Sequence, residues 1–503
     1  MAVNLQIRLS CIELSIKTEK FIVSSNFSDS GIAIVGQDWL RYKLSFQELN
    51  IYMSALFGTD GIRGIAGEFP LDTATVAVIG KALADYVLRE KAGTARIVVG
   101  RDTRESGPQI EAAIVAGIRI AGGECESAGV ITTPGVAYLA GAGNYDLGVV
   151  ISASHNPFRD NGIKIFLPNG MKSDSNLENF VESAVISSKH NPELWLDLKS
   201  PRVNESLRLD YIRHLIDVFA DTRFDGMRVV IDCANGAASE IAPEVFSSLG
   251  ASVITINAKP DGRNINDNCG SLFPEGLVRK VLMERADVGI AFDGDADRTL
   301  LIDEQGEIMD GDRLLRILAA DLLEQGKLVN RTVVATIMSN LGLERSLKNL
   351  GIRLLRTPVG DKYVLEELLR TNSELGGEQS GHIIFPAISL VGDGIVTAAS
   401  VLKTASKRSE KFSSLAPDFK QFPQILINVP VREKLPFDSV PEIATAVAEV
   451  EAELAGSGRL LLRYSGTENL ARVMIEAEDS ALVESNARKI AETIAKTIGA
   501  PAN

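Results

Sequence analysis

Three carboxylates stand at alternate positions directly after an apolar run. The segment DGDADR occupies residues 293–298, and the five residues before it, 288–292, are all apolar or glycine. Such a run predicts a buried strand, so the carboxylates should gather on the loop at its end. Hard divalent cations prefer oxygen ligands, and we predict that one Mg²⁺ binds here to three side chains, Asp293, Asp295 and Asp297.

Two other interpretations of this segment give the aspartates different tasks. An EF-hand loop beginning at Asp293 would need glycine at its sixth position, where this chain has Arg298, and a strand rather than a helix comes before it. The EF-hand is therefore excluded. In a D-x-D phosphatase Asp293 would be the nucleophile, and this alternative stays open.

A serine follows a second apolar run. The segment ISASHNP at 151–157 continues the run 147–151, so Ser154 should lie on a loop at the end of a buried strand. Its ordinary interpretation is a polar turn before proline. A serine hydrolase is disfavoured because the G-x-S-x-G elbow is missing. In addition, adjacent side chains of an extended segment point in opposite directions, which places His155 badly as a base for Ser154.

Three further segments carry groups suited to a phosphorylated sugar. FGTDGIRG at 57–64 and GRDTRESG at 100–107 set arginines among glycines, so that the backbone can approach a ligand while guanidinium groups bind phosphate. GGEQSGH at 376–382 offers a carboxylate, an amide and a hydroxyl to sugar hydroxyls. RYSGTE at 463–468, with Arg472 beyond it, offers backbone N–H groups, hydroxyls and arginines to phosphate. Each of these segments also suits an ordinary polar turn.

The elements that must position these groups are strands followed by helices. RIVVG at 96–100 predicts a strand, and Ser106 as N-cap with an apolar face over 110–121 predicts the helix that follows. The same opening recurs as RVVI at 228–231 and RTVV at 331–334, which indicates three related α/β units.

The last part of the chain is expected to be a smaller unit. Residues 406–424 are polar and contain prolines, which indicates a linker. Beyond it we predict a strand pair around 459–477 and a final helix with its apolar face over 483–498.

Length and composition limit the class of protein. At roughly 150 residues per domain, 503 residues make three or four domains, and 45% hydrophobic with 23% charged residues is ordinary for a globular chain. A net charge of −14 disfavours nucleic acid as a partner. Four scattered cysteines without C-x-x-C disfavour a disulfide framework and a thiolate zinc site. We find neither a run of 18 apolar residues nor a signal peptide, so we expect a cytoplasmic protein that spans no membrane.

Taken in order along the chain, the five segments resemble the motifs of the α-D-phosphohexomutase family, and they cover residues 57–472. Three stretches resemble the branch that acts on amino sugars: GEQSGH at 377–382, NINDNCGS at 264–271 and VGDKYV at 359–364. The branch that acts on mannose and glucose phosphates usually has another residue at Gln379.

The resemblance implies an α/β protein with four domains around a central cleft. Three would be similar mixed α/β units, and the fourth a smaller, open-faced α+β unit. The resemblance starts at Phe57, so the residues before Met53 are expected to be dispensable. The expected parts are an N-terminal extension (1–52), domain I with a phosphoserine loop (53–200), domain II with a metal loop (201–307), domain III with a sugar loop (308–421) and domain IV with a phosphate site (422–503).

The activity that the resemblance implies is the interconversion of glucosamine 6-phosphate and glucosamine 1-phosphate, which feeds UDP-N-acetylglucosamine and cell-wall synthesis. It would proceed through a phosphoserine and a bisphosphorylated sugar. The expected cofactors are one Mg²⁺ per site and a sugar 1,6-bisphosphate activator, and the expected state is a monomer or a homodimer. A phosphomannomutase/phosphoglucomutase is the alternative inside the family, and a D-x-D phosphatase or a non-catalytic phosphosugar-binding protein are alternatives outside it.

The resemblance also assigns roles to individual residues. Ser154 would carry the transferable phosphoryl group and bind Mg²⁺ together with the three aspartates. Arg63, Lys164 and His382 match residues that assist proton transfer or stabilise charge. The residues expected to bind substrate are Arg298, Glu378, Ser380, Arg463, Ser465, Gly466, Thr467 and Arg472. Asn469 stands where the family usually has proline, which predicts a local difference in the backbone without loss of function.

Overall fold

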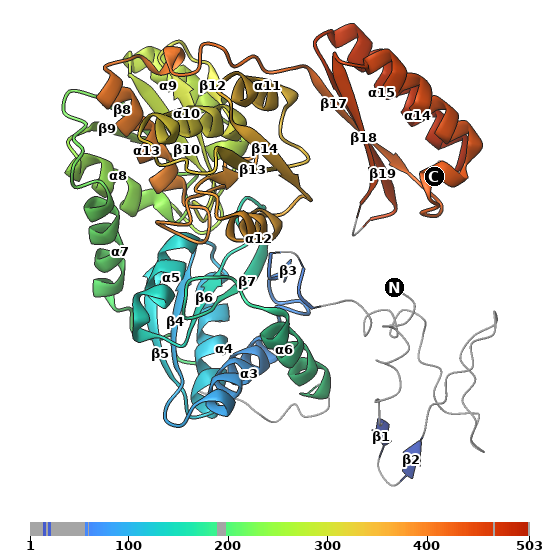
Figure 1. The fold of residues 1–503 in the computed structure, drawn as a ribbon. Coiled ribbons are helices and arrows are strands. Elements are labelled where there is room, and N and C mark those ends of the chain that lie inside the picture. Colours follow the sequence, from blue (N-terminus) through green and yellow to red (C-terminus); the bar gives the residue numbers. More distant parts are fainter. Residues whose placement is uncertain are drawn as a thin grey trace. The chain divides into compact units, whose positions relative to one another are not determined.

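The computed structural model describes residues 14–16, 19–21, 56–58, 60–188, 198–465 and 468–500 (Figure 1). The chain divides into two compact units, Met1–Ala55 and Leu56–Asn503. In the first unit, β1 (Leu14–Ile16) pairs antiparallel with β2 (Glu19–Phe21). The expectation that residues 1–52 are dispensable otherwise lies outside the described residues, and the second unit is the subject from here on.

Three sheets of the second unit share one topology, which confirms the three related α/β units predicted from the recurring opening. Their strand orders are β3-β7-β6-β4-β5, β12-β11-β10-β8-β9 and β14-β13-β15-β16. In each sheet three strands run parallel, and a fourth returns antiparallel from the third through a hairpin. The strands are β3 (Ile62–Ile65), β4 (Arg96–Arg101), β5 (Glu124–Val130), β6 (Leu147–Ile151), β7 (Asp160–Phe166), β8 (Arg228–Asp232), β9 (Ser252–Ile256), β10 (Val288–Phe292), β11 (Thr299–Asp303), β12 (Ile308–Met309), β13 (Thr332–Thr336), β14 (Arg353–Thr357), β15 (Gly376–Gly377) and β16 (Ile383–Ile384).

Helices connect these strands and cover the sheets (Figure 1). The helix predicted after 96–100 forms as α4, and Ser106 stands at its N-cap position. The Ser106 hydroxyl, however, accepts a hydrogen bond from Asn161 Nδ2 at 2.9 Å and caps no helix N–H. The helices are α3 (Thr73–Glu90), α4 (Gly107–Ile120), α5 (Thr133–Leu139), α6 (Ser175–Ser188), α7 (Glu205–Val218), α8 (Ala238–Ser248), α9 (Glu275–Glu284), α10 (Gly311–Glu324), α11 (Leu341–Asn349), α12 (Asp361–Thr371) and α13 (Gly394–Arg408).

One apolar core joins the three sheets. Val98 of β4, Ile231 of β8 and Ala335 of β13 all belong to one continuous cluster of buried side chains. Because side chains alternate along a strand, the neighbouring residues Ile97 and Val99 face a second cluster under α3, α4 and α6. The three α/β units are therefore held together by shared apolar packing.

The C-terminal unit has a sheet and a core of its own. Strands β17 (Gln424–Pro430), β18 (Gly458–Tyr464) and β19 (Leu470–Ala477) form an antiparallel sheet in the order β17-β19-β18. Helices α14 (Pro441–Leu454) and α15 (Ser480–Thr497) pack on one face of it over a separate apolar cluster (Figure 1). The predicted strand pair and final helix are confirmed. The predicted linker is shorter than expected, because α13 extends to Arg408 and β17 begins at Gln424.

In the part of the chain that the structure describes, no helix combines the length and the apolar composition that crossing a membrane requires.

Candidate active site

Three of the segments with candidate site residues lie on equivalent loops of the three sheets. Ser154 lies between β6 and β7, the three aspartates lie between β10 and β11, and Glu378 lies between β15 and β16. Each loop therefore follows the third parallel strand of its sheet. The carboxyl ends of parallel strands are where ligands bind in open α/β sheets. The sequence indicated the repeated units but not this equivalence of the loops.

Ser154 is buried and stands in the left-handed backbone region, with φ of +52°. Its Oγ donates a hydrogen bond to Asp293 Oδ2 at 2.5 Å. The same backbone conformation brings His155 Nδ1 to 3.4 Å from Ser154 Oγ, so the expectation that the two side chains point apart is wrong. His155 is nevertheless poorly suited as a base, because burial and the charges of Arg298 and Arg63 lower its pKa to about 4. Its Nδ1 also lies 3.2 Å from Arg298 Nη1, which can only donate.

A fully buried arginine holds the Ser154 loop in this conformation. Arg104 Nη2 donates to the carbonyl oxygens of Ser154 and Asn156, both at 2.9 Å, and Nη1 donates to the carbonyl of Pro157. Arg104 Nε pairs with Asp102 Oδ2 at 2.8 Å. The expectation that the arginines of 100–107 bind phosphate is therefore wrong for Arg104, since its N–H groups are used inside the protein.

Replacing Arg104 with methionine is expected to lower the free energy of unfolding by about 3–5 kcal/mol, because Asp102 then remains as an uncompensated buried charge. Urea unfolding followed by circular dichroism measures this change. The double variant Arg104→Met/Asp102→Asn should recover part of the loss, since it removes that charge. Equal stabilities of the single and double variants would contradict a charge-pairing role for Arg104.

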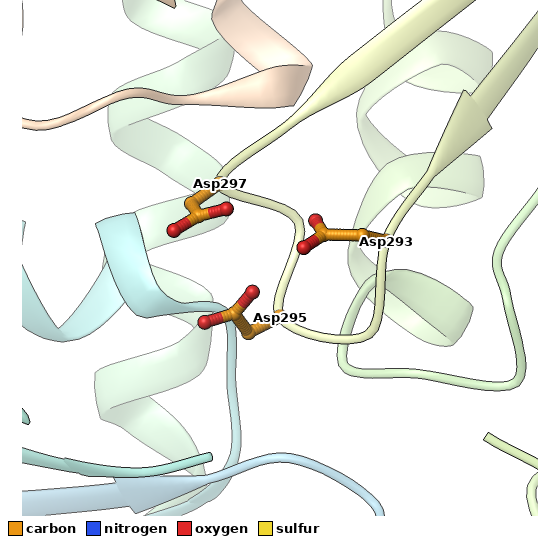
Figure 2. A group of neighbouring side chains, drawn as sticks. All are labelled: Asp293, Asp295 and Asp297. Carbon is orange, nitrogen blue, oxygen red and sulfur yellow. The ribbon is translucent and has the colours of Figure 1, made fainter. Parts of the chain in front are cut away.

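The three aspartates form a compact acidic cluster (Figure 2). They are buried, and one carboxylate oxygen from each lies within 4.8 Å of the others. Asp295 Oδ1 and Asp297 Oδ1 are buried and accept no hydrogen bond from any described residue. Free carboxylate oxygens that converge at a buried point fit a hard divalent cation, so the cluster can hold a metal ion.

Lys164 neutralises part of this charge. Its Nζ lies 3.0 Å from Asp295 Oδ2, 3.3 Å from Asp297 Oδ2 and 3.2 Å from Asp60 Oδ2. Burial alone would lower the pKa of Lys164, but these three carboxylates hold it well above its ordinary value. Lys164 is therefore a fixed cation at neutral pH. Among the described residues no lysine forms an ion pair with Asp293, and burial together with Asp297 and Asp295 raises the pKa of that carboxyl well above its ordinary value.

A line of alternating charges runs from the cluster to the sugar loop. Asp60 pairs with Arg63 at 2.6 Å and with Lys172, and Lys172 pairs in turn with Asp361. His382 Nε2 lies 3.4 Å from Asp361 and accepts a hydrogen bond from the Gly392 N–H at 3.0 Å. His382 Nδ1 lies 3.7 Å from Asp297, and although burial lowers the pKa of His382, the carboxylates of Asp297, Asp361 and Glu378 raise it above its ordinary value.

Sequence reasoning missed part of this line. Asp60 and Asp361 lie inside motifs that the sequence singled out, FGTDGIRG and VGDKYV, but neither was picked as a site residue. Lys172 stands in a turn between β7 and α6 and carries no motif, so no signal in the chain could have found it.

The sugar loop is held by its own neighbours. Glu378 Oε1 accepts the N–H of Gly360 at 3.2 Å, and Ser380 Oγ lies 3.4 Å from Glu378 Oε2. Arg298, expected to bind substrate, reaches Asp297 and His155. The Nε atoms of Arg298 and Arg63 are buried and donate no hydrogen bond to a described residue, although Arg298 Nε lies 3.8 Å from Asp297 Oδ1.

The described residues predicted to bind a phosphate lie on β18 and β19 and directly after β18. Arg463 lies directly opposite Arg472 in the strand register. Like charges in such a pair repel, and burial together with Arg472 lowers the pKa of Arg463. Arg472 Nη2 lies 3.4 Å from Ser465 Oγ. Gly466 and Thr467, like Thr59 of the first glycine-rich motif, lie outside the described residues, and the carbonyl of Asn469 accepts from Val431 N at 2.9 Å.

The structure thus brings together one group of predicted residues by direct contact: Ser154, Asp293, Asp295, Asp297, Lys164, Arg298 and His382. Arg63 joins them through Asp60. Arg463, Ser465 and Arg472 form a second group in the C-terminal unit.

Models of the four domains of one protein family match the chain in order. These are phosphoglucomutase/phosphomannomutase alpha/beta/alpha domain I at residues 54–192, domain II at 209–306, domain III at 310–422 and the C-terminal domain at 426–493. The chain therefore belongs to the phosphoglucomutase/phosphomannomutase family, and the protein is an isomerase.

A relative from Koribacter versatilis, named phosphoglucosamine mutase, is 48% identical over 453 residues, which cover 88% of this chain and 97% of the relative. Two solved structures share the fold. A phosphoglucomutase/phosphomannomutase family protein from Burkholderia thailandensis has a TM-score of 0.70 at 23% identity over 88% of this chain and 97% of its own. Aspergillus fumigatus N-acetylphosphoglucosamine mutase, in complex with GlcNAc-6P and magnesium, has a TM-score of 0.61 at 17% identity over 87% and 95%.

Proposed function

We propose that the protein is a phosphoglucosamine mutase, which interconverts glucosamine 6-phosphate and glucosamine 1-phosphate and so feeds UDP-N-acetylglucosamine and cell-wall synthesis. The observation that carries the proposal is the hydrogen bond from Ser154 Oγ to Asp293 of the acidic cluster, in a chain nearly half identical to a phosphoglucosamine mutase. The hydroxyl that would carry phosphate and the carboxylates that would bind its cation are in contact.

Ser154 is proposed to hold the transferable phosphoryl group. In the first step its Oγ–P bond breaks as a new bond forms between phosphorus and a sugar hydroxyl oxygen, whose proton leaves to a base. The sugar bisphosphate then turns over and returns its other phosphoryl group to Ser154 Oγ. Because the resting enzyme must already carry phosphate, a sugar 1,6-bisphosphate is the proposed activator.

The cation proposed for the cluster is Mg²⁺, held by Asp293, Asp295, Asp297 and an oxygen of phosphorylated Ser154. The two buried carboxylate oxygens that accept no hydrogen bond from a described residue, Asp295 Oδ1 and Asp297 Oδ1, support this ligand set. When bound, Mg²⁺ supplies positive charge to the transferring phosphoryl group.

Positive side chains are proposed to stabilise the rest of the charge that develops. Phosphoryl transfer passes through a loose transition state, so positioned cations contribute most of the catalysis. Lys164 is fixed beside two of the aspartates, and Arg298 and Arg63 each keep a buried Nε that donates no hydrogen bond to a described residue. His382, with its Nδ1 near Asp297, is proposed to assist proton transfer or stabilise charge. Glu378 and Ser380 are proposed to bind sugar hydroxyls.

The phosphate of the substrate that is not reacting is proposed to bind in the C-terminal unit, at Arg463, Ser465, Gly466, Thr467 and Arg472. Arg463 and Arg472 face each other across two strands, and an anion between them would relieve their repulsion. A planar guanidinium also fixes the orientation of phosphate, which a lysine does not.

Replacing Arg463 with alanine is expected to raise KM on the order of tenfold or more in both directions of the reaction, because the same site holds the distal phosphate of either substrate. Arg463→Lys should recover only part of the loss. Steady-state kinetics with glucosamine 6-phosphate and with glucosamine 1-phosphate measures both values. Arg488→Ala, on α15 of the same unit, is the matched control, and unchanged KM in Arg463→Ala would place the distal phosphate elsewhere.

The function itself is tested by incubating the purified protein with Mg²⁺, a trace of sugar bisphosphate, and glucosamine 6-phosphate. Mannose and glucose phosphates run in parallel decide between the branches of the family. Release of inorganic phosphate without isomerisation would favour the D-x-D phosphatase, and binding without turnover would favour a phosphosugar-binding protein.

A further inference from the structure

One carboxylate connects the sugar loop to the linker that precedes the C-terminal unit. Gln379 of the sugar loop donates from Nε2 to Asp310 Oδ2 at 3.2 Å. Gln421 of the linker donates from Nε2 to the same oxygen at 3.3 Å. The two amides, 42 residues apart by their numbers, therefore share a single acceptor atom.

Asp310 is fixed by its place at the N-terminus of α10. Its Oδ1 accepts the N–H of Arg313 at 3.1 Å as the N-cap of the helix, so only Oδ2 is left for the two amides. Gly311 N donates to the carbonyl of Gln379 at 3.0 Å. A Cβ at Gly311 would lie 2.1 Å from the carbonyl oxygen of Glu378, so the helix start lies flat against the sugar loop and residue 311 must be glycine.

The linker is fixed on both sides of Gln421. Before it, Asp418 pairs with Arg316 at 2.6 Å. After it, Phe422 exchanges two hydrogen bonds with the side chain of Asn340, at 2.9 and 3.0 Å. Because the backbone is held at both places, the Gln421 side chain keeps its amide at Asp310.

The C-terminal unit rests on the turn that contains Asn340. Arg459 of β18 donates from Nη2 to the carbonyl of Ser339 at 2.6 Å, and the N–H of Leu341 donates to Glu476 of β19 at 3.1 Å. Asp312, in the first turn of α10, accepts the N–H of Asn340 at 2.7 Å. The first turn of α10 thus contacts the sugar loop, the linker and the turn that supports the C-terminal unit.

We propose that Asp310 is a positioning residue that couples occupancy of the sugar loop to the linker of the phosphate-binding unit, so that the sugar and the distal phosphate are bound cooperatively. The direction of the coupling follows from the shared oxygen. The oxygen accepts both hydrogen bonds at once and shares its negative charge between them, so a sugar that draws the Gln379 amide toward itself strengthens the bond between Asp310 and Gln421. The linker is then held more firmly while substrate is bound. This inference rests on the proposed function.

A double-mutant cycle tests the coupling. Gln379→Leu, Gln421→Leu and the double variant are prepared with Asp310 intact and again in Asp310→Asn, which keeps a good N-cap but offers an NH₂ group or a neutral oxygen to the amides. KM and kcat for glucosamine 6-phosphate are measured for all eight proteins. Gln424→Leu is the matched control, because it makes the same change three residues further on, away from Asp310.

With Asp310 intact, each single change should raise KM about three- to tenfold with kcat within about twofold, and the double variant should raise KM by several-fold less than the product of the singles. In Asp310→Asn the two changes should act independently, and Gln424→Leu should leave KM unchanged. If the substitutions only disturbed packing, kcat would fall while KM rose. The interaction between the Gln379 and Gln421 changes would then be the same with Asp310 as with asparagine at that position.

Independent effects with Asp310 intact, or an unchanged KM in Gln421→Leu, would overturn the coupling. Gln421 is exposed, so Gln421→Leu is expected to fold. The KM of this variant therefore still tests the coupling if a protein substituted at Asp310 or Gln379 does not fold. Wild-type protein that fails to convert glucosamine 6-phosphate would instead overturn the proposed function. The same cycle would then be measured as calorimetric binding of glucosamine 6-phosphate, where independent effects would again overturn the coupling.

Discussion

Replacing Ser154 with alanine is expected to abolish mutase turnover, with a fall in kcat on the order of 10⁴-fold or more, as the loss of other covalent nucleophiles causes. Alanine offers no oxygen to carry the phosphoryl group. The fold should persist, because the change removes the hydrogen bond to Asp293 and the longer contact with His155, and the buried acceptor left without its donor costs about 1–3 kcal/mol. Coupled kinetic assays and peptide mass spectrometry measure the two consequences, lost activity and lost phosphate on residue 154.

Ser152→Ala is the matched control for this change. The Ser152 hydroxyl is buried two residues away, where it accepts the N–H of Ser154 at 2.9 Å and donates to Asp102 at 2.7 Å. Its loss should reduce stability and lower activity far less, and Ser154 should still be phosphorylated. An active Ser154→Ala protein, with phosphate found on another residue, would refute the phosphoserine mechanism.

Replacing Asp293 with asparagine should separate the activity of the protein from its stability. Activity should fall by about 10³-fold, because the cluster loses one charged ligand for the cation that stabilises the transferring phosphoryl group. Stability without metal should not fall. Burial and the neighbouring carboxylates of Asp297 and Asp295 raise the pKa of Asp293 well above its ordinary value, so the charged form is disfavoured without metal and a neutral asparagine removes that penalty. An asparagine oxygen can still accept from Ser154.

Melting temperatures measured with Mg²⁺ and in EDTA distinguish the loss of metal binding from a loss of stability. The melting temperature of the wild type should rise with Mg²⁺, since an ion that binds only the folded state stabilises it by mass action. Asp293→Asn should show a much smaller rise, and in EDTA it should melt no lower than the wild type. Asp303→Asn, at the far end of β11 in the same hairpin, should keep the wild-type response to Mg²⁺. Full wild-type activity in EDTA would contradict a metal role for the cluster.

The parts of the site that the sequence predicted share one local signal. Ser154 and the three aspartates lie on the loops that follow two apolar runs, and the end of a buried strand places a polar loop at the edge of a sheet independently of the rest of the chain. The three related units could be predicted for the same reason, because the opening of each is a short stretch of sequence that becomes the first of the three parallel strands in its sheet.

The parts that the sequence did not predict depend on contacts between distant segments. Arg104 has the same neighbours in sequence whether it binds phosphate or the carbonyls of residues 154–157, and only the meeting of two loops 50 residues apart decides between them. His155 depends on the left-handed backbone of Ser154, which no local pattern indicated. The local sequence around Asp310 indicates no more than a helix cap. Its second oxygen accepts hydrogen bonds from Gln379 and Gln421 only because folding brings these two distant residues to it.

A sugar bisphosphate that turns end over end must meet the serine, the acidic cluster and the sugar loop at the same spacing before and after the turn. The loops after β6, β10 and β15 belong to three sheets that share one apolar core. Their spacing is therefore fixed when the protein folds and stays the same before and after the intermediate turns. The C-terminal unit, with its own core, meets the third α/β unit through hydrogen bonds and ion pairs such as Glu476 to Leu341. Contacts of this kind can be exchanged for water without opening an apolar core, so the C-terminal unit can move against the other three more easily than those three can move against one another.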